Sequence, residues 1–179
     1  VAIFTKPLHL KNFIFILFLM SSGLSWTQTN TRVQFDSFDY YVAQSKNNTD
    51  NNVNTQLSYG LKAKKFAMKL ALDSLIIQSN FIVSQLQLEN GYNDLFIKTS
   101  QENLKLSERV KDTLSIAIIF KDLGDYYYNK STDSAYYYYH KSEKLYQSLK
   151  LNYNTADVLL NIAIIQKNEK DFTGSEVTS

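Results

Sequence analysis

Few residues in this chain are of the types that carry out catalysis. It has no cysteine, which excludes thiolate zinc sites, disulfides and cysteine nucleophiles. Its two histidines, His9 and His140, are too few for a histidine-based metal site. The carboxylates are scattered, and the sequence has no glycine-rich phosphate loop, serine elbow or paired acids. We therefore expect no catalytic residue, no cofactor and no metal, and interpret the chain as a protein that is not an enzyme.

His140 can be compared with the phospho-acceptor histidine of a kinase. Such a histidine is followed directly by an acidic residue and, a few positions later, by a proline. His140 is followed instead by Lys141-Ser142-Glu143, which places neither residue correctly. We interpret His140 as an exposed histidine on a helix.

Two runs of tyrosines, 126–128 and 136–139, are the most conspicuous candidates for binding. Consecutive residues of a helix point about 100° apart, so only one or two rings of each run face the core. Tyr127 and Tyr139 are predicted to be core residues. The rings predicted to be free for a partner, as rigid amphipathic anchors, are Tyr128, Tyr136 and Tyr137. The alternative is that these rings only cover the surface of the helices.

Four lysines, Lys62, Lys64, Lys65 and Lys69, form a basic cluster, and all but Lys64 fall on one helical face. We interpret this face as solvated, and the alternative is contact with anionic headgroups or an acidic partner. The net charge of the chain is only +2. Because nucleic-acid binding normally needs a concentrated basic surface, no nucleic-acid partner is expected for this segment.

The elements that must position these residues are helices. Five glycines and one proline are too few for the turns of an all-β protein, so an all-α fold is predicted. Apolar residues recur at helical spacing between polar turns. The predicted helices span 56–71, 74–89, 93–108, 113–128, 133–148, 155–167 and 171 onward.

A repeat of 39 residues organises these helices. Asn90, Asn129 and Asn168 are equally spaced, and Phe81, Phe120 and Leu159 follow the same interval. Asn90-Gly91, Asn129 and Asn168 are predicted to lie where the chain reverses, because asparagine and glycine tolerate the left-handed backbone that ends a helix. The residues predicted to cap helix starts with a side-chain oxygen are Asp73, Asp112 and Asp133.

Within this register the chain resembles the tetratricopeptide repeat (TPR) family. The first matching unit consists of Phe120, Leu123, Gly124, Tyr127, Ala135, Tyr139 and Ser142. The next unit repeats the pattern with Leu159, Ile162 and Ala163. The chain departs from the family in its longer period and in the absence of a proline closing each unit. The resemblance implies an α-solenoid of stacked antiparallel hairpins whose concave face receives a protein or peptide.

The N-terminal region has the parts of an export signal. Lys6 and Lys11 precede the apolar run 13–20, and small residues follow it. We predict a signal peptide at 1–27, or alternatively an uncleaved membrane anchor. A polar spacer at 28–55 is predicted to contain one short amphipathic helix. That helix would hold Phe35, Phe38, Tyr41 and Val42.

The predicted protein is therefore an exported TPR-like repeat domain over 56–179, with an incomplete last unit, in the periplasm or cell envelope. Its extended repeats are similar to the exported N-terminal sensor regions of bacterial envelope regulators of the histidine kinase or helix-turn-helix type. This resemblance implies the sensing or coupling part of a larger regulator, tethered to the membrane through the parent protein, in which a kinase domain could follow. The alternative is a self-contained envelope scaffold or assembly factor. Self-association through the open C-terminal end is also expected, because terminal repeats need a cap.

Overall fold

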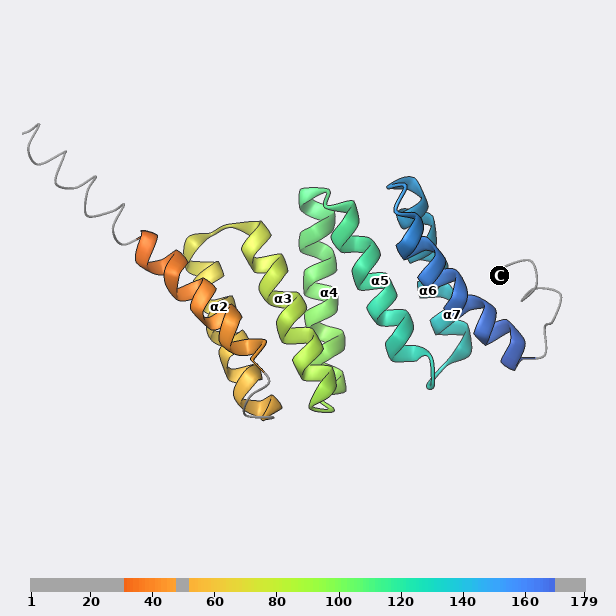
Figure 1. Ribbon diagram of the computed structural model, residues 1–179, viewed down its shortest axis with the longest axis horizontal. Coiled ribbons are helices and arrows are strands. Elements are labelled where there is room, and N and C mark those ends of the chain that lie inside the picture. Colours follow the sequence, from red (N-terminus) through yellow and green to blue (C-terminus); the bar gives the residue numbers. More distant parts are fainter. Residues whose placement is uncertain (1–30, 48–51, 170–179) are drawn as a thin grey trace, which may run out of the picture.

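The computed structural model describes residues 31–47 and 52–169, and within them the chain is entirely helical (Figure 1). The first helical segment covers 31–45. The six that follow are α2 (Val53–Leu70), α3 (Asp73–Glu89), α4 (Asn93–Val110), α5 (Thr113–Tyr127), α6 (Thr132–Ser148) and α7 (Asn152–Asn168). The six helices predicted between 56 and 167 are all present, and their ends agree within three residues. The predicted signal peptide and the predicted helix from 171 lie outside the described residues.

The helix starts follow the predicted capping in one case out of three. Asp112 caps α5, because its carboxylate accepts the backbone N–H of Ser115 at 3.1 Å. The prediction for Asp133 was wrong, since Ser131 stands earlier and its hydroxyl oxygen caps α6. The prediction for Asp73 was also wrong. Its carboxylate lies inside the first turn of α3 and pairs with Arg109 at 2.8 Å.

The helix ends follow the prediction only in part. Gly91 has a positive φ, as predicted for the Asn90-Gly91 turn, whereas none of the three asparagines is left-handed. The other residues with positive φ in the described part of the chain are Ala71, Lys111 and Lys150. At Lys111 and Lys150 the left-handed backbone lets the next N–H bond back to a carbonyl in the last turn, at 2.9 and 3.0 Å. These hydrogen bonds offset the cost of positive φ in a lysine, so a glycine or asparagine is not required there.

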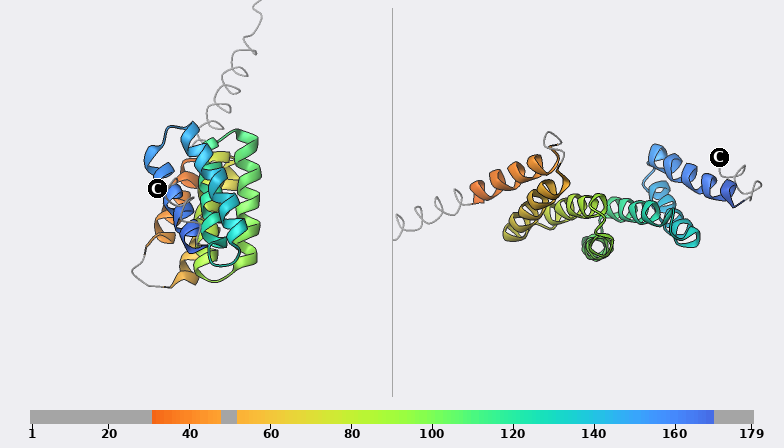
Figure 2. Two further views of the ribbon diagram at one scale, coloured as in Figure 1. Left: turned by 90° about the vertical axis from the view of Figure 1, so that its right-hand side faces the viewer. Right: turned by 90° about the horizontal axis from the view of Figure 1, so that it is seen from below.

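The helices form a row of hairpins that bends into an arc (Figures 1 and 2). Each helix packs on the next along the chain, most loosely between α4 and α5. In the view from below, α4 lies on one side of the row, and 31–45 and α7 lie toward the other side. We call the side of 31–45, α3, α5 and α7 the inner face, and the side of α2, α4 and α6 the outer face. An ion pair spans each side: Lys121–Asp157 joins α5 to α7, and Lys64–Glu102 joins α2 to α4.

The short helix predicted within 28–55 lies at 31–45 and is an ordinary member of this row. Phe38 and Val42 are buried against Ala63 and Ala67 of α2. The small alanines let the two helices approach closely enough for Phe38 to fill the space between them. The region predicted to be a polar spacer therefore holds a packed helix and the first residues of α2.

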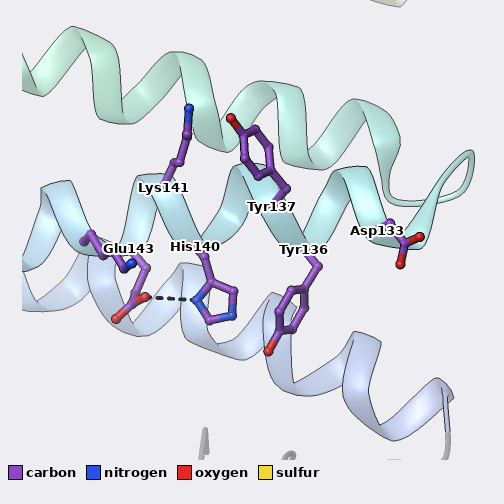
Figure 3. Close-up of a pocket in the computed structure, with 7 residues that line it drawn as sticks. Asp133, Tyr136, Tyr137, His140, Lys141 and Glu143 are labelled. Atoms are coloured by element: carbon purple, nitrogen blue, oxygen red, sulfur yellow. Dashed lines mark hydrogen bonds and ion pairs between the residues drawn. The ribbon is translucent and has the colours of Figure 1, made fainter.

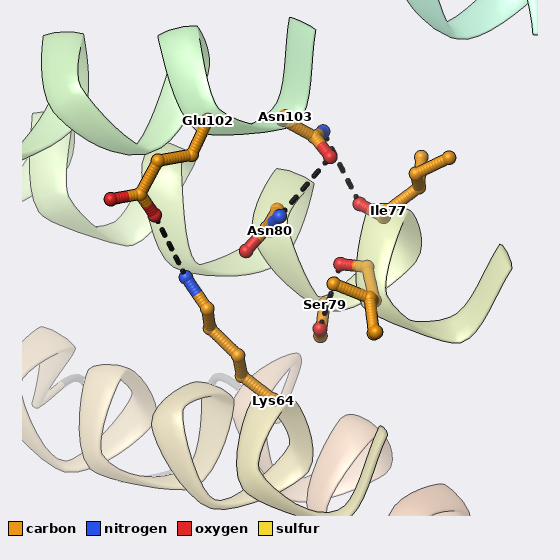
Figure 4. Close-up of polar contacts among 7 residues, drawn as sticks. Lys64, Ile77, Ser79, Asn80, Glu102 and Asn103 are labelled. Carbon is orange, nitrogen blue, oxygen red and sulfur yellow. Dashed lines mark hydrogen bonds and ion pairs between the residues drawn. The ribbon is translucent and has the colours of Figure 1, made fainter. Parts of the chain in front are cut away.

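The interface of α3 and α4 is unusually polar (Figure 4). The Asn80 side-chain N–H donates to the Asn103 side-chain oxygen at 3.2 Å, and Asn103 donates to the Ile77 carbonyl at 3.3 Å. In the part of the chain that the structure describes, the buried side-chain oxygens of Asn80, Gln87 and Ser107 have no hydrogen-bond partner. Because unsatisfied buried polar atoms cost free energy, this hairpin gains less from packing than an apolar one would.

Candidate functional site

The predicted positions of the first repeat unit lie on α5 and α6, and those of the next unit lie on α7. Gly124 allows a close approach of α5 to α6, since a Cβ atom built there would lie 2.6 Å from ring carbons of Tyr139. The Ser142 hydroxyl donates to the Ala117 carbonyl at 2.8 Å. Of the other predicted positions, Phe120, Leu123, Ala135, Tyr139, Ile162 and Ala163 are buried, and Tyr127 and Leu159 are half-buried.

Two of the three tyrosines predicted to face a partner lie together on α6. Tyr136 and Tyr137 line an open hollow of about 800 Å³ with His140 and Lys141 (Figure 3). Tyr128 is not part of it, because its half-buried ring packs against the core cluster that α5, α6 and α7 share. The hollow lies on the outward side of α6, so these rings belong to the outer face of the arc.

The contacts around this hollow hold its aromatic rings in place. His140 Nδ1 lies 3.2 Å from the Glu143 carboxylate, and the His140 ring meets Tyr136 edge-on at 4.3 Å. The Lys141 ammonium lies 4.6 Å from the centre of the Tyr137 ring and 5.0 Å from that of Phe120. Such cation–π contacts order a long lysine side chain at the surface.

A second group of polar side chains lies on the inner face of α5 and α7. The Lys121 ammonium is 2.9 Å from the Asp125 carboxylate and 3.6 Å from that of Asp157. The Tyr139 hydroxyl, which comes from α6, donates to Asp125 at 2.7 Å. Three helices therefore contribute to one charged network, which we call the inner-face cluster: Lys121, Asp122, Asp125, Tyr139 and Asp157.

Three groups of this cluster have shifted pKa values. Burial, and then the charge of Asp125, raises the pKa of Asp122 to about 7. Burial lowers the pKa of Lys121, but its hydrogen bond to Asp125 and the charges of Asp125 and Asp157 outweigh that effect, so the pKa is raised. Burial and the hydrogen bond to Asp125 raise the pKa of Tyr139. Perturbed pKa values that gather at one place mark a candidate functional site.

Exposed apolar side chains share helix faces with the inner-face cluster, at one-turn and two-turn spacing from Lys121 and Asp157. Tyr153 is 86% exposed, and Leu160 and Ile164 follow it on the same face of α7. Leu114 is exposed at the start of α5. Sequence reasoning missed these residues, although the 39-residue register would have paired Leu114 with Tyr153 and Lys121 with Leu160.

The inner-face cluster is a network of ion pairs and a hydrogen bond. Lys121 lies beside the carboxylates of Asp125 and Asp157, and the Tyr139 hydroxyl donates to Asp125. Within residues 31–47 and 52–169, no three His, Cys, Asp or Glu side chains gather closely enough to hold a metal ion. The charged groups of the cluster are held in fixed positions beside exposed apolar side chains, an arrangement that suits the binding of a partner.

Comparison with known proteins supports the fold. No family model matches the sequence, and no curated protein matches it. Among solved structures, the apo form of RapI is similar, with a TM-score of 0.70 at 12% sequence identity. The similarity covers 80% of this chain and 53% of that chain, so the chain spans about half the length of RapI. The fold is therefore an all-helical, TPR-like repeat. None of the helices in the described residues is both long and apolar enough to span a bilayer.

Proposed function

We propose that this chain is a non-catalytic domain that binds a peptide or protein segment on its inner face. The observation that carries the proposal is the inner-face cluster, in which Lys121 and the carboxylates of Asp125 and Asp157 share helix faces with exposed apolar side chains. Interfaces commonly combine apolar anchors with a few fixed polar groups that set orientation. The fold of the apo form of RapI is similar, which supports a repeat array as the scaffold.

The geometry suggests how such a segment would bind. Tyr153 and Leu160 offer apolar area on α7, and Leu114 offers it on α5. Between them, the Lys121–Asp125–Asp157 network presents both a cation and carboxylates at fixed positions. Because Tyr139 is buried and tied to Asp125, the carboxylate is preorganised and loses little entropy on binding.

We further propose that the domain is exported and forms the sensing or coupling part of a larger envelope regulator. The predicted signal peptide and the resemblance of the extended repeats to such sensor regions support this role. In that setting the bound segment would be an extracytoplasmic peptide or a neighbouring domain, and the membrane tether would come from the parent protein.

The test is selection of a binding peptide from a random phage-displayed library, followed by calorimetry on matched variants. Tyr153→Ser removes an exposed tyrosine from the inner face, and Tyr137→Ser removes one from the outer face. We expect the first to weaken binding by about tenfold or more, as loss of an interface aromatic does, and the second to leave it unchanged. Loss of binding only in Tyr137→Ser would refute the inner face as the site.

Self-association is the competing explanation for the exposed row on α7. A second copy could cover Tyr153, Leu160 and Ile164 as well as a peptide could. Sedimentation of the chain over a range of concentrations separates the two. The proposed function predicts that the selected peptide binds the monomer, whereas self-association predicts that peptide and second copy compete.

A further inference from the structure

Helix α2 has a charge pattern that the proposed function does not use. It carries four lysines and no acidic residue. Lys64 pairs with Glu102 of α4 at 3.5 Å (Figure 4). For Lys62, Lys65 and Lys69, no ion pair with an acid is present among the described residues. The outer face of α2 therefore presents three positive charges that no carboxylate neutralises.

Two of these lysines are held in position by aromatic rings. The Lys62 ammonium lies 5.1 Å from the centre of the Tyr59 ring and 5.5 Å from that of Tyr41. The Lys69 ammonium lies 5.1 Å from the centre of the Phe66 ring. The rings order the side chains but carry no net charge, so the positive charge stays available to a partner.

Exposed apolar side chains lie among the lysines. Leu61 is 48% exposed and Met68 is 60% exposed, and they stand seven residues apart on the same helical face. Lys65 lies between them on that face, and Leu72 follows beyond the helix end. A solvated helix face would carry polar residues at these positions. Clustered exposed apolar side chains instead mark an interaction surface.

The surface contains a recess. A hollow of about 430 Å³ lies between α2 and the start of α4, lined by Leu57, Leu61, Lys62, Lys65 and Tyr92 among others. The Tyr92 hydroxyl donates to the Asn54 side-chain oxygen at 3.2 Å, which fixes the ring that forms one wall. The hollow is shallow and open, and a side chain of a partner helix can lie in it between Leu61 and Tyr92.

We propose that this surface, which we call the α2 surface (Leu61, Lys62, Lys65, Met68, Lys69 and Tyr92), docks an acidic amphipathic helix. An apolar side chain of that helix occupies the hollow beside Leu61 and Tyr92. Carboxylates that flank it pair with Lys62 and Lys65. Amphipathic helices that bind in grooves do so through apolar side chains three, four and seven residues apart. The lysines favour a helix that also carries acidic side chains. The α2 surface lies on the opposite side of the arc from the inner face, so it does not depend on the proposed function.

The probe is a synthetic amphipathic helix of about four turns with leucines on one face and glutamates on the other. Its counterpart has a lysine for every glutamate. Binding to the full 179-residue chain is followed by fluorescence anisotropy of the labelled probe. We expect the acidic helix to bind and the basic one not to bind. The double variant Lys62→Glu with Lys65→Glu should weaken binding by about tenfold or more, and Leu61→Ser should weaken it as well.

The matched control is Lys98→Glu with Lys105→Glu, which makes the same charge change at exposed positions of α4 outside the α2 surface. Affinity should then stay within about twofold. All variants are exposed-residue changes, and far-UV circular dichroism checks that they fold. Equal binding of both helices, or an equal loss in the α4 control, would overturn the proposal. The proposal would also be overturned if the chain bound phosphatidylglycerol vesicles through Lys62 and Lys65 but did not bind the acidic helix.

Discussion

Gly124→Ala tests the close contact between α5 and α6. The added Cβ would lie 2.6 Å from two ring carbons of Tyr139, whereas carbon atoms in favourable contact lie about 3.5–4.0 Å apart. The ring would have to move by about 1 Å, but it is buried and its hydroxyl is tied to Asp125. Overpacking of this kind costs about 1–3 kcal/mol. The gain in helix propensity from glycine to alanine, about 1 kcal/mol, offsets part of that cost.

Disturbance of the Tyr139–Asp125 hydrogen bond adds about 1.5–3 kcal/mol if the bond breaks. After the propensity gain, overpacking leaves a loss of about 0–2 kcal/mol, which rises to about 1.5–5 kcal/mol when the hydrogen bond breaks. Because the ring must move, we expect the bond to break and Gly124→Ala to lower the free energy of unfolding by about 1.5 kcal/mol or more. Gly60→Ala is the matched control, because its Cβ would meet the nearest atom, Ile82 Cγ2, at 3.3 Å. Its propensity gain and slight crowding should nearly cancel, within about 0.5 kcal/mol of zero.

The assay is urea unfolding followed by far-UV circular dichroism. In a chain that already carries Tyr139→Leu, the further change Gly124→Ala should cost less free energy of unfolding than it does in the unmodified chain. The smaller leucine side chain gives the added Cβ room. If Gly124→Ala and Gly60→Ala shift the midpoint equally, the two helices do not meet at Gly124 and the repeat register is wrong. An absence of coupling in the double variant would contradict the contact with Tyr139 directly.

Two further predictions concern charge and capping. The pKa of Asp122 is raised from 3.8 to about 7, so the folded state holds a proton that the unfolded state releases, and stability should fall as pH rises from about 4 to 7. Asp122→Asn should remove this penalty and stabilise the chain by up to about 4 kcal/mol at pH 8, with little effect at pH 4. Thermal melts between pH 4 and 8 measure the gain. A gain in stability that does not depend on pH would contradict the raised pKa of Asp122. Asp112→Ala should cost about 1 kcal/mol through loss of the α5 cap, whereas Asp133→Ala should cost only a few tenths. Urea unfolding of both variants checks this, and equal losses would show that Asp133 also caps its helix.

The helices could be predicted from the sequence because their signals are local. Apolar spacing and polar turns placed α3 to α6 nearly correctly, and Asp112 was recognised as a cap. The failures came from competition between neighbours. Ser131 reaches the free N–H groups of α6 before Asp133 does. Lys150 adopts positive φ because a hydrogen bond across the turn compensates it.

The candidate site could be predicted only in part, since it depends on how hairpins face one another. Tyr136 and Tyr137 were correctly expected at the surface. The sequence could not show that they lie on the outer face, because this depends on how α6 packs against α5 and α7. The pairing of Lys121 with Asp157 joins residues from different repeats, and no local pattern signals it. The buried hydrogen bond between Asn80 and Asn103 was not predicted, because asparagines at these positions are equally compatible with a solvent-exposed helix face.

The most direct test of the central claim is chemical-shift mapping of the library-selected peptide on the isotope-labelled chain. Binding at the inner face predicts that the largest amide shifts fall on α5 and α7 around Lys121, Asp125, Asp157 and Leu160. Residues around Tyr137 on the outward side of α6 should change little. Shifts centred on Tyr136 and Tyr137, with α7 unaffected, would contradict the inner face as the binding site.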